Sequence, residues 1–390
     1  MRGKEGGIDM NDSEQQSIYQ GNDGRISRRN FFKLMGVAGA TIAMGGALAG
    51  CGGNSTSSTT SDSGSSSAAS DEPKTQTVTD MNGNEVEVPT NPTKYADGWY
   101  AHNEITIMLT GAEGLVATHC AQKDYPWMYK VCPNMSNATA TFGKDFNFED
   151  LAALEPQVIF DSTDDLRDKA TEVGIPLVNC MFKTFDEMKQ SIELTAQVFG
   201  GDAPEIAKKY NAELDQVLAD TRKKTDGLSD DERVSVMHGN SVYTLTIDGT
   251  DTIIDDWIKA AGGKNAVTES TKGNAAAKFT MEQVVAWNPQ VIITGKADEV
   301  DQILSDPNWA SIDAVKNGQV YVNPKGVFGW DRYGVEELLQ IQWAAATLHP
   351  ELFDDLDIND KVKDFYKTYL NYELTDGDVE LILAAKNPQD

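Results

Sequence analysis

The chain has 390 residues, a formal net charge of −28 and an isoelectric point near 4.4. This length exceeds one ordinary domain and is sufficient for two lobes with cores of their own. Nucleic acids and anionic lipid surfaces are excluded as partners, because both are bound through basic patches. The acidity favours solubility but does not identify a function.

Residues 1–50 are predicted to be an export signal. The segment Ser27–Lys33 contains the paired Arg28 and Arg29 and resembles a twin-arginine signal; an apolar run with several glycines follows it. The run ends in Leu-Ala-Gly before Cys51, which resembles the lipobox of bacterial lipoproteins. Cys51 is therefore expected to carry a lipid and to become the new N-terminus. The alternative is a transmembrane anchor that ends at a cysteine.

Residues 51–75 are dominated by Ser, Thr, Gly and Ala, and such a segment behaves as a flexible tether. The folded body is expected from residue 76, beginning with a β-hairpin over residues 77–89 around an Asn-Gly-Asn turn. A strand then gives way to an apolar helix at Trp99, Tyr100 and His102. This kind of junction is a favoured ligand position in open α/β sheets.

One stretch occurs twice, at residues 146–160 and 279–293, with Phe, Glu, Ala, Pro, Gln, Val and Ile identical at aligned positions. In each copy a proline ends an amphipathic helical turn and a β-branched strand follows. We interpret the two copies as one unit in each lobe of a duplicated α/β protein. The alternative is that a common helix–proline–strand sequence pattern recurs by chance.

Residues 202–227 carry the longest helical pattern, with Asp202 as a candidate N-cap and Pro204 in the first turn. The helix lies between the two copies, so it is expected to bridge an N-terminal lobe (residues 76–201) and a C-terminal lobe (residues 228–390). A surface helix of the first lobe is the alternative. Glycine- and aromatic-rich residues 326–334 form a loop before the last apolar helices.

Several sequence segments, taken together, resemble those of the substrate-binding lipoproteins of ABC importers that carry ferric siderophores, heme and cobalamin. They include the two Glu…Pro-Gln-Val-Ile units, Gly174–Val178, Gly318–Tyr321, Trp330–Tyr333 and His349–Phe353. The resemblance implies an α/β fold of two Rossmann-like lobes joined by a single long α-helix, with the ligand cleft between them. It implies no enzymatic activity, no cofactor of its own, and a monomer that delivers its ligand to an ABC permease dimer with a cytoplasmic ATPase.

In this family a glutamate on each lobe engages permease arginines, and the matching positions are Glu149 and Glu282; the alternative is that both are ordinary helix N-terminal acids. The resemblance places ligand contacts on loops that face the cleft, although aromatic residues there also serve as core packing. The matching positions are Trp99, Tyr100, His102, Tyr125, Trp127, His238, Tyr243, Thr250, Trp330, Arg332 and Tyr333.

The ligand is expected to be a metal chelate. An iron complex, siderophore or heme, ranks first; a corrinoid such as cobalamin ranks next and a molybdate-type oxyanion third. His102 is a weak candidate for metal coordination, and coordination by His238 is left open. Export also permits a Cys120–Cys132 disulfide, which the sequence does not decide, whereas Cys180 is expected to be buried and inert.

Because of the export signal and the lipid expected on Cys51, the protein is expected to be anchored to the outer face of the cell membrane. An exported cofactor enzyme is the alternative class, but the chain lacks the motifs of a nucleophile elbow, a phosphate loop or a zinc protease. A surface receptor that works without a permease is a further alternative.

Overall fold

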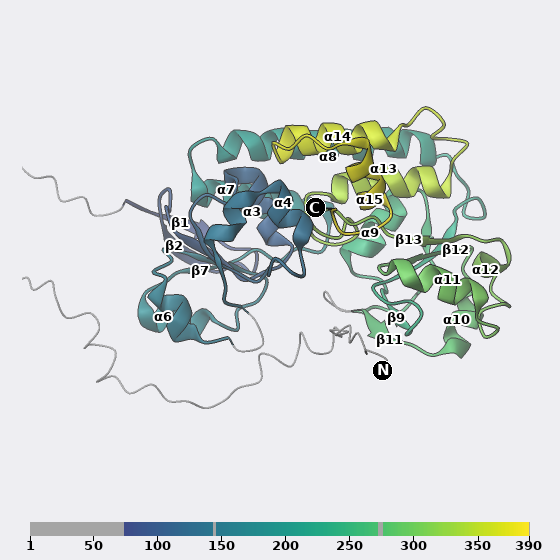
Figure 1. Ribbon diagram of the computed structural model, residues 1–390, viewed down its shortest axis with the longest axis horizontal. Helices are drawn as coiled ribbons and strands as arrows, with labels where there is room; N and C mark the ends of the chain where they lie inside the picture. Colours follow the sequence, from purple (N-terminus) through teal and green to yellow (C-terminus); the bar gives the residue numbers. More distant parts are fainter. Residues whose placement is uncertain (1–73, 143–145, 272–275, 390) are drawn as a thin grey trace, which may run out of the picture. The chain divides into compact units, whose positions relative to one another are not determined.

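Two parallel sheets organise the chain, and each is surrounded by helices (Figure 1). The computed structural model describes residues 74–142, 146–271 and 276–389, and these belong to one compact unit. The predicted export signal, Cys51 and the tether up to residue 73 lie outside the described residues. Within the described residues, no helix combines the length and the apolar character that a membrane crossing requires.

The first sheet has the strand order β5-β4-β3-β6-β7, and all of its neighbouring strands are parallel. The hairpin β1/β2 precedes it. The strands of this part of the chain, hairpin included, are β1 (Thr75–Thr79), β2 (Glu85–Pro89), β3 (Tyr95–Asp97), β4 (Leu115–Thr118), β5 (Thr139–Ala140), β6 (Ile159–Asp161) and β7 (Leu177–Asn179). Its helices are α3 (His102–Thr110), α4 (Pro126–Val131), the 3-10 turn η1 (Pro133–Asn137), α5 (Phe148–Ala153), α6 (Arg167–Val173) and α7 (Phe185–Phe199). We call this part, residues 74–201, the N-terminal lobe.

The second sheet has the order β10-β8-β12-β13 and is also parallel. Its strands, together with the small β9/β11 pair, are β8 (Ser235–Gly239), β9 (Thr246–Ile247), β10 (Lys264–Asn265), β11 (Ala277–Lys278), β12 (Val291–Thr294) and β13 (Val320–Val322). The helices are α9 (Ile253–Ala260), α10 (Met281–Trp287), α11 (Ala297–Ser305), α12 (Asp313–Lys316), α13 (Glu337–Leu348), α14 (Ile358–Tyr369) and α15 (Asp376–Leu383). We call residues 228–389 the C-terminal lobe.

The predicted long helix is α8, Ala203–Thr225, with Pro204 in its first turn. It packs against α3 and α7 of the N-terminal lobe and against α9 and α13 of the C-terminal lobe. Tyr210, Leu214 and Leu218 on its inner face are buried, as the periodicity predicts. Asp202 occupies the N-cap position, but its side chain makes no capping hydrogen bond. One hydrophobic core continues from the N-terminal lobe through α8 into α9, α13 and α14, so the helix is part of the packing between the lobes.

The repeated stretch forms the same structure twice, α5 followed by β6 and α10 followed by β12. In each copy, the glutamine of the repeat makes two hydrogen bonds to one residue at the start of the neighbouring strand. The Gln157 N–H donates to Lys94 O, and Gln157 Oε1 accepts from the N–H of Lys94. Gln290 makes the same pair of bonds with Ser235. The repeat therefore sets the register between its own strand and β3 or β8.

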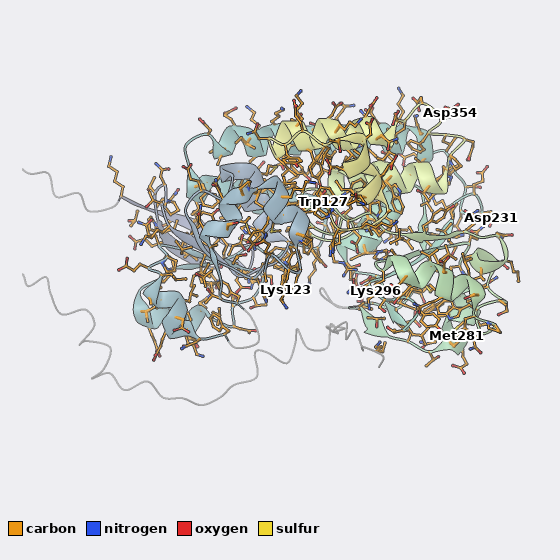
Figure 2. All side chains as sticks on the ribbon, in the orientation of Figure 1. Lys123, Trp127, Asp231, Met281, Lys296 and Asp354 are labelled. Carbon is orange, nitrogen blue, oxygen red and sulfur yellow. The ribbon has the colours of Figure 1, made fainter. Side chains whose placement is uncertain are left out.

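The hairpin, the helix after the first junction and the strand Leu177–Asn179 are confirmed. The tether prediction extends one residue too far, because β1 begins at Thr75. The segment from Cys120 to Gly143 is less irregular than predicted, since it contains α4, η1 and β5. The C-terminal residues also return to the N-terminal lobe: the indole Nε1 of Trp127, which is labelled in Figure 2, donates to Lys386 O at 2.9 Å.

Candidate functional site

Aromatic side chains from both lobes meet at the junction between β3 and the loop after β13. Trp99 follows β3, and its ring lies 5.6 Å from that of Tyr333 in the C-terminal lobe. Phe182, after β7, approaches Tyr333 at the same centroid distance. Tyr125 stacks on Phe328 at 5.9 Å. Of the predicted ligand set, the structure therefore brings Trp99 against Tyr333, and Tyr125 against the loop that carries Tyr333.

A histidine that the sequence analysis did not select lies in the same cluster. His119 follows β4 and stacks on Tyr100 with a centroid distance of 3.6 Å. Its Nδ1 lies 2.9 Å from Gly98 O, so Nδ1 carries the proton and Nε2 is left with a lone pair. Burial lowers the pKa of His119 to about 4, which keeps the imidazole neutral. Among the residues that the structure describes, no hydrogen bond reaches Nε2.

A lysine completes this group. Lys325 lies in the loop after β13, and its Nζ is 5.7 Å from the centroid of the Tyr125 ring. Burial lowers its pKa because the ammonium loses water, and the nearby Asp331 and Asp124 only partly oppose this effect. Within the described ranges, no carboxylate forms an ion pair with Nζ. A half-buried ammonium beside aromatic rings is a candidate anion contact.

His102 lies in the interior of the N-terminal lobe rather than at a cleft edge. Its side chain is fully buried, with Nδ1 2.8 Å from Asp97 Oδ2 and Nε2 2.9 Å from Thr195 Oγ1. Burial disfavours the imidazolium, but the Asp97 carboxylate outweighs this effect and raises the pKa of His102 to about 10. Both ring nitrogens are thus occupied by structural hydrogen bonds, which leaves no lone pair for a metal.

His238 and Arg332 share a buried ionic network in the C-terminal lobe. His238 lies between Asp248, at 2.9 Å, and Asp331, at 3.3 Å. Arg332 pairs with the same two carboxylates, through Nε to Asp331 at 2.7 Å and through a terminal nitrogen to Asp248 at 3.3 Å. Burial opposes ionisation of Asp331, but Arg332 and His238 hold the pKa of its carboxyl well below the usual range. This network fixes the loop that carries Tyr333.

The other predicted ligand residues make structural contacts with protein groups. Trp127 and Trp330 are buried, and the Trp330 indole donates to Glu336 Oε1 at 2.9 Å. Tyr243 stacks on Trp309 and donates to Asp306 Oδ2 at 3.1 Å. Thr250 forms an isolated parallel β-bridge with Ser270. These side chains have structural roles that the sequence alone does not distinguish from ligand contacts.

Comparison with known proteins assigns the family. The family model described as periplasmic binding protein matches residues 104–326, more than half of the chain. The chain belongs to the periplasmic binding protein family. Proteins of this family bind solutes for ABC transporters outside the cytoplasm and are not enzymes, so this chain is a solute-binding protein rather than an enzyme. The predicted family, the predicted two-lobe α/β fold and the prediction that the protein is not an enzyme are confirmed by this family assignment.

Several proteins that are similar to this chain have names that state what they bind. The molybdate-binding protein of Haemophilus influenzae is 30% identical over 57% of this chain and 69% of its own length. The iron(3+)-hydroxamate-binding protein of Bacillus subtilis is 25% identical over 80% of this chain and 97% of its own. A solved periplasmic solute binding protein from Veillonella parvula has 27% identity and a TM-score of 0.68, covering 80% of this chain and 97% of that one.

The two repeated glutamates occupy equivalent positions in this binding protein. Glu149 is the second residue of α5, after the N-cap Asn147, and Glu282 is the second residue of α10, after the N-cap Thr280. Both side chains are exposed. Hydrogen bonds from its own backbone N–H and from Thr280 lower the pKa of Glu282. Figure 2 labels the neighbouring Met281 at the start of α10.

Neither a disulfide nor a metal cluster occurs among the described residues. Cys120, Cys132 and Cys180 are free and buried, so the expected burial of Cys180 is confirmed and Cys120 and Cys132 do not form a disulfide. Over the ranges 74–142, 146–271 and 276–389, no group of three His, Cys, Asp or Glu side chains is arranged to hold a metal ion.

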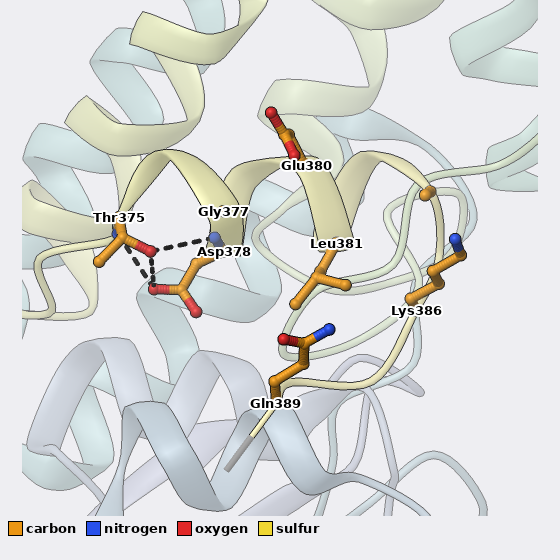
Figure 3. Close-up of a pocket in the computed structure, with 8 residues that line it drawn as sticks. Thr375, Gly377, Asp378, Glu380, Leu381, Lys386 and Gln389 are labelled. Carbon is orange, nitrogen blue, oxygen red and sulfur yellow. Dashed lines mark hydrogen bonds between the residues drawn. The ribbon is translucent and has the colours of Figure 1, made fainter.

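A pocket of about 380 Å³ lies beside α15 and is separate from the predicted ligand residues (Figure 3). Its lining comes from residues 375–389 and includes the Thr375–Asp378 pair of the α15 capping box. Lys130 of α4 contacts Asp378 at 3.0 Å. The pocket therefore belongs to the attachment of the C-terminal segment and not to the aromatic junction.

Proposed function

We propose that this protein captures a small metal oxyanion of the molybdate type and delivers it to an ABC permease dimer with its cytoplasmic ATPase. The observation that carries the proposal is Lys325, a half-buried ammonium without a carboxylate ion pair among the described residues. A tetrahedral oxyanion at this position would accept hydrogen bonds from the Lys325 ammonium. The molybdate-binding relative supports the same class.

The size of the ligand follows from the aromatic contacts. Trp99 and Phe182 already touch Tyr333, and Tyr125 already touches Phe328, with centroids 5.6 to 5.9 Å apart. A flat chelate such as heme would have to separate these rings, whereas an oxyanion of a few ångströms requires little displacement. This argument reverses the order expected from the sequence, in which an iron complex ranks first and a molybdate-type oxyanion third.

An iron complex is the second candidate, and the iron(3+)-hydroxamate-binding relative favours it because the match extends over nearly its whole length. In that case the neutral His119 and the rings of Trp99, Tyr100 and Tyr125 would contact the chelate. A solved vitamin B12-binding protein of Vibrio cholerae shares the fold, with 20% identity and a TM-score of 0.53. This likeness concerns the fold and does not favour vitamin B12 as the ligand.

Calorimetric titration of the purified full chain with molybdate and with a ferric hydroxamate separates the two candidates. Molybdate is expected to bind, and Lys325→Met is expected to weaken it about 10- to 100-fold, since a hydrogen bond to a charged group contributes about 1.5–3 kcal/mol. Lys169→Met, at an exposed position on α6, is the matched control. Binding of the ferric hydroxamate alone would favour the second candidate, and binding of neither ligand refutes both.

Two further roles complete the proposal. Glu149 and Glu282 are proposed to orient the protein on the permease, because both carboxylates are exposed at the same place in the two copies of the repeat. Cys51 is proposed to carry a lipid that anchors the protein to the outer face of the membrane; two relatives are named lipoproteins.

A further inference from the structure

Three fully buried glutamates meet where the two lobes join. Glu104 is on α3 of the N-terminal lobe, and Glu336 and Glu337 lie at the start of α13 in the C-terminal lobe. Carboxyl groups are rarely buried without a basic partner. Within the described residues, none of these three carboxyls forms an ion pair.

The carboxyl of Glu104 connects the lobes directly. Its Oε1 accepts the backbone N–H of Glu336 at 3.1 Å, so a residue of one lobe satisfies a donor at the first turn of a helix in the other. The contact is close: a Cβ placed on Gly334 would lie 1.9 Å from Glu104 Oε2. Only glycine at residue 334 leaves room for this carboxyl.

The two glutamates of α13 hold the loop of residues 326–334, which carries Phe328 and Tyr333. Glu336 accepts from the Phe328 N–H and from the Trp330 indole, each at 2.9 Å. Glu337 Oε1 accepts the Tyr333 N–H at 3.2 Å. The position of the loop therefore depends on Glu336 and Glu337, and the backbone of Glu336 is itself bound by Glu104 across the lobe junction.

Protons are the available means of neutralising this cluster. Glu104 Oε2 and Glu337 Oε2 are buried without a hydrogen-bond partner, and no metal-binding arrangement exists in the described part of the chain. Burial raises the pKa of Glu336 to about 7, and burial together with Glu336 raises that of Glu104. The other titratable and charged groups that face the three glutamates are Tyr210, Tyr366, Asp331, Arg332 and Asp256.

We propose that Glu104 is a positioning residue: when protonated it holds the ligand loop of residues 326–334 against the N-terminal lobe, and its deprotonation places a negative charge beside the buried carboxyls of Glu336 and Glu337, which loosens the loop and weakens ligand binding. The part that concerns the ligand rests on the proposed function, whereas the movement of the loop does not. The direction follows from linkage. Because burial raises the pKa of the Glu104 carboxyl above its ordinary value in the folded protein, the stabilisation is complete in acid and is lost as the pH rises through that raised pKa.

Measurements on the full chain between pH 5.5 and 8.5 test this proposal. In the wild type, tryptophan fluorescence and the thermal midpoint are expected to change together within this pH range, because the Trp330 indole donates a hydrogen bond to Glu336 and Trp99 contacts Tyr333. Above the midpoint of that change the Kd for molybdate is expected to rise by up to about tenfold per pH unit. Glu104→Gln keeps the acceptor oxygen but cannot ionise, so the part of the change that depends on Glu104 should disappear.

Glu113→Gln, an exposed position just beyond α3, is the matched control and should retain the wild-type profile. If Glu104→Gln does not fold, Glu337→Gln removes another ionisable carboxyl of the cluster and should also flatten the profile. A flat wild-type profile, or a profile unchanged in the Gln variant, overturns the proposal. Absence of molybdate binding at every pH overturns only the proposed ligand, since fluorescence and melting still report on the loop.

Discussion

Reciprocal exchange of one residue between the two copies of the repeat should have opposite effects on stability. Glu155 and Asn288 occupy aligned positions just after α5 and α10, and both have left-handed backbone conformations, with φ of 56° and 43°. Asparagine tolerates this region well, whereas glutamate does not. Glu155→Asn is therefore expected to stabilise the protein, and Asn288→Glu to destabilise it.

The structure supplies the magnitudes. Glu155→Asn should relieve about 0.5–1 kcal/mol of backbone strain. It loses only the exposed ion pair with Lys94 at 3.2 Å, which contributes at most about 0.5 kcal/mol. Asn288→Glu adds the strain and removes two hydrogen bonds to Asp313, each at 2.9 Å, for a total cost of about 2–3 kcal/mol.

Urea unfolding followed by fluorescence measures both free energies of unfolding, and an unchanged m-value verifies that the transitions are comparable. Asn288→Gly separates the two contributions, because it keeps the backbone freedom but loses the side-chain bonds. The reasoning fails if Asn288→Glu costs less than Asn288→Gly, or if Glu155→Asn destabilises the protein by more than about 1 kcal/mol.

The remaining predictions concern the proposed partners. Glu149→Ala together with Glu282→Ala should abolish uptake in cells with an intact permease while leaving the ligand Kd within about twofold, because a rim charge acts on association with the partner; unchanged uptake would contradict docking through these residues. Cys51→Ser should release the protein from the membrane fraction into the soluble fraction with its fold intact, and continued membrane association would show that another segment anchors it.

The fold was largely predictable because its signals are local. Proline after an amphipathic turn and a β-branched run specify a helix and then a strand, and both copies of the repeat form them. The long α8 follows from its uninterrupted period. By contrast, α4 has only six residues and two aromatic side chains in the Cys120–Gly143 segment, so its pattern is too short to be distinguished from a loop.

The candidate site was less predictable because burial depends on distant residues. His102 is next to Trp99 and Tyr100 in the chain, but its partner Thr195 comes from α7, and no local signal shows that contact. His119 and Lys325 belong to no motif. The only sequence signal for His119 was its position directly after a parallel strand, where ligands are commonly bound.

The attachment of the C-terminal residues to α4 affects how the protein should be handled. Lys386 O accepts the Trp127 indole, and Gln389 O accepts from Lys130, so the last residues before the carboxyl end are hydrogen-bonded to the N-terminal lobe. An affinity tag or reporter fused after residue 390 would begin next to these bonds. Fusions placed there should alter the melting behaviour of the protein, whereas a tag inserted before Lys74 avoids this contact.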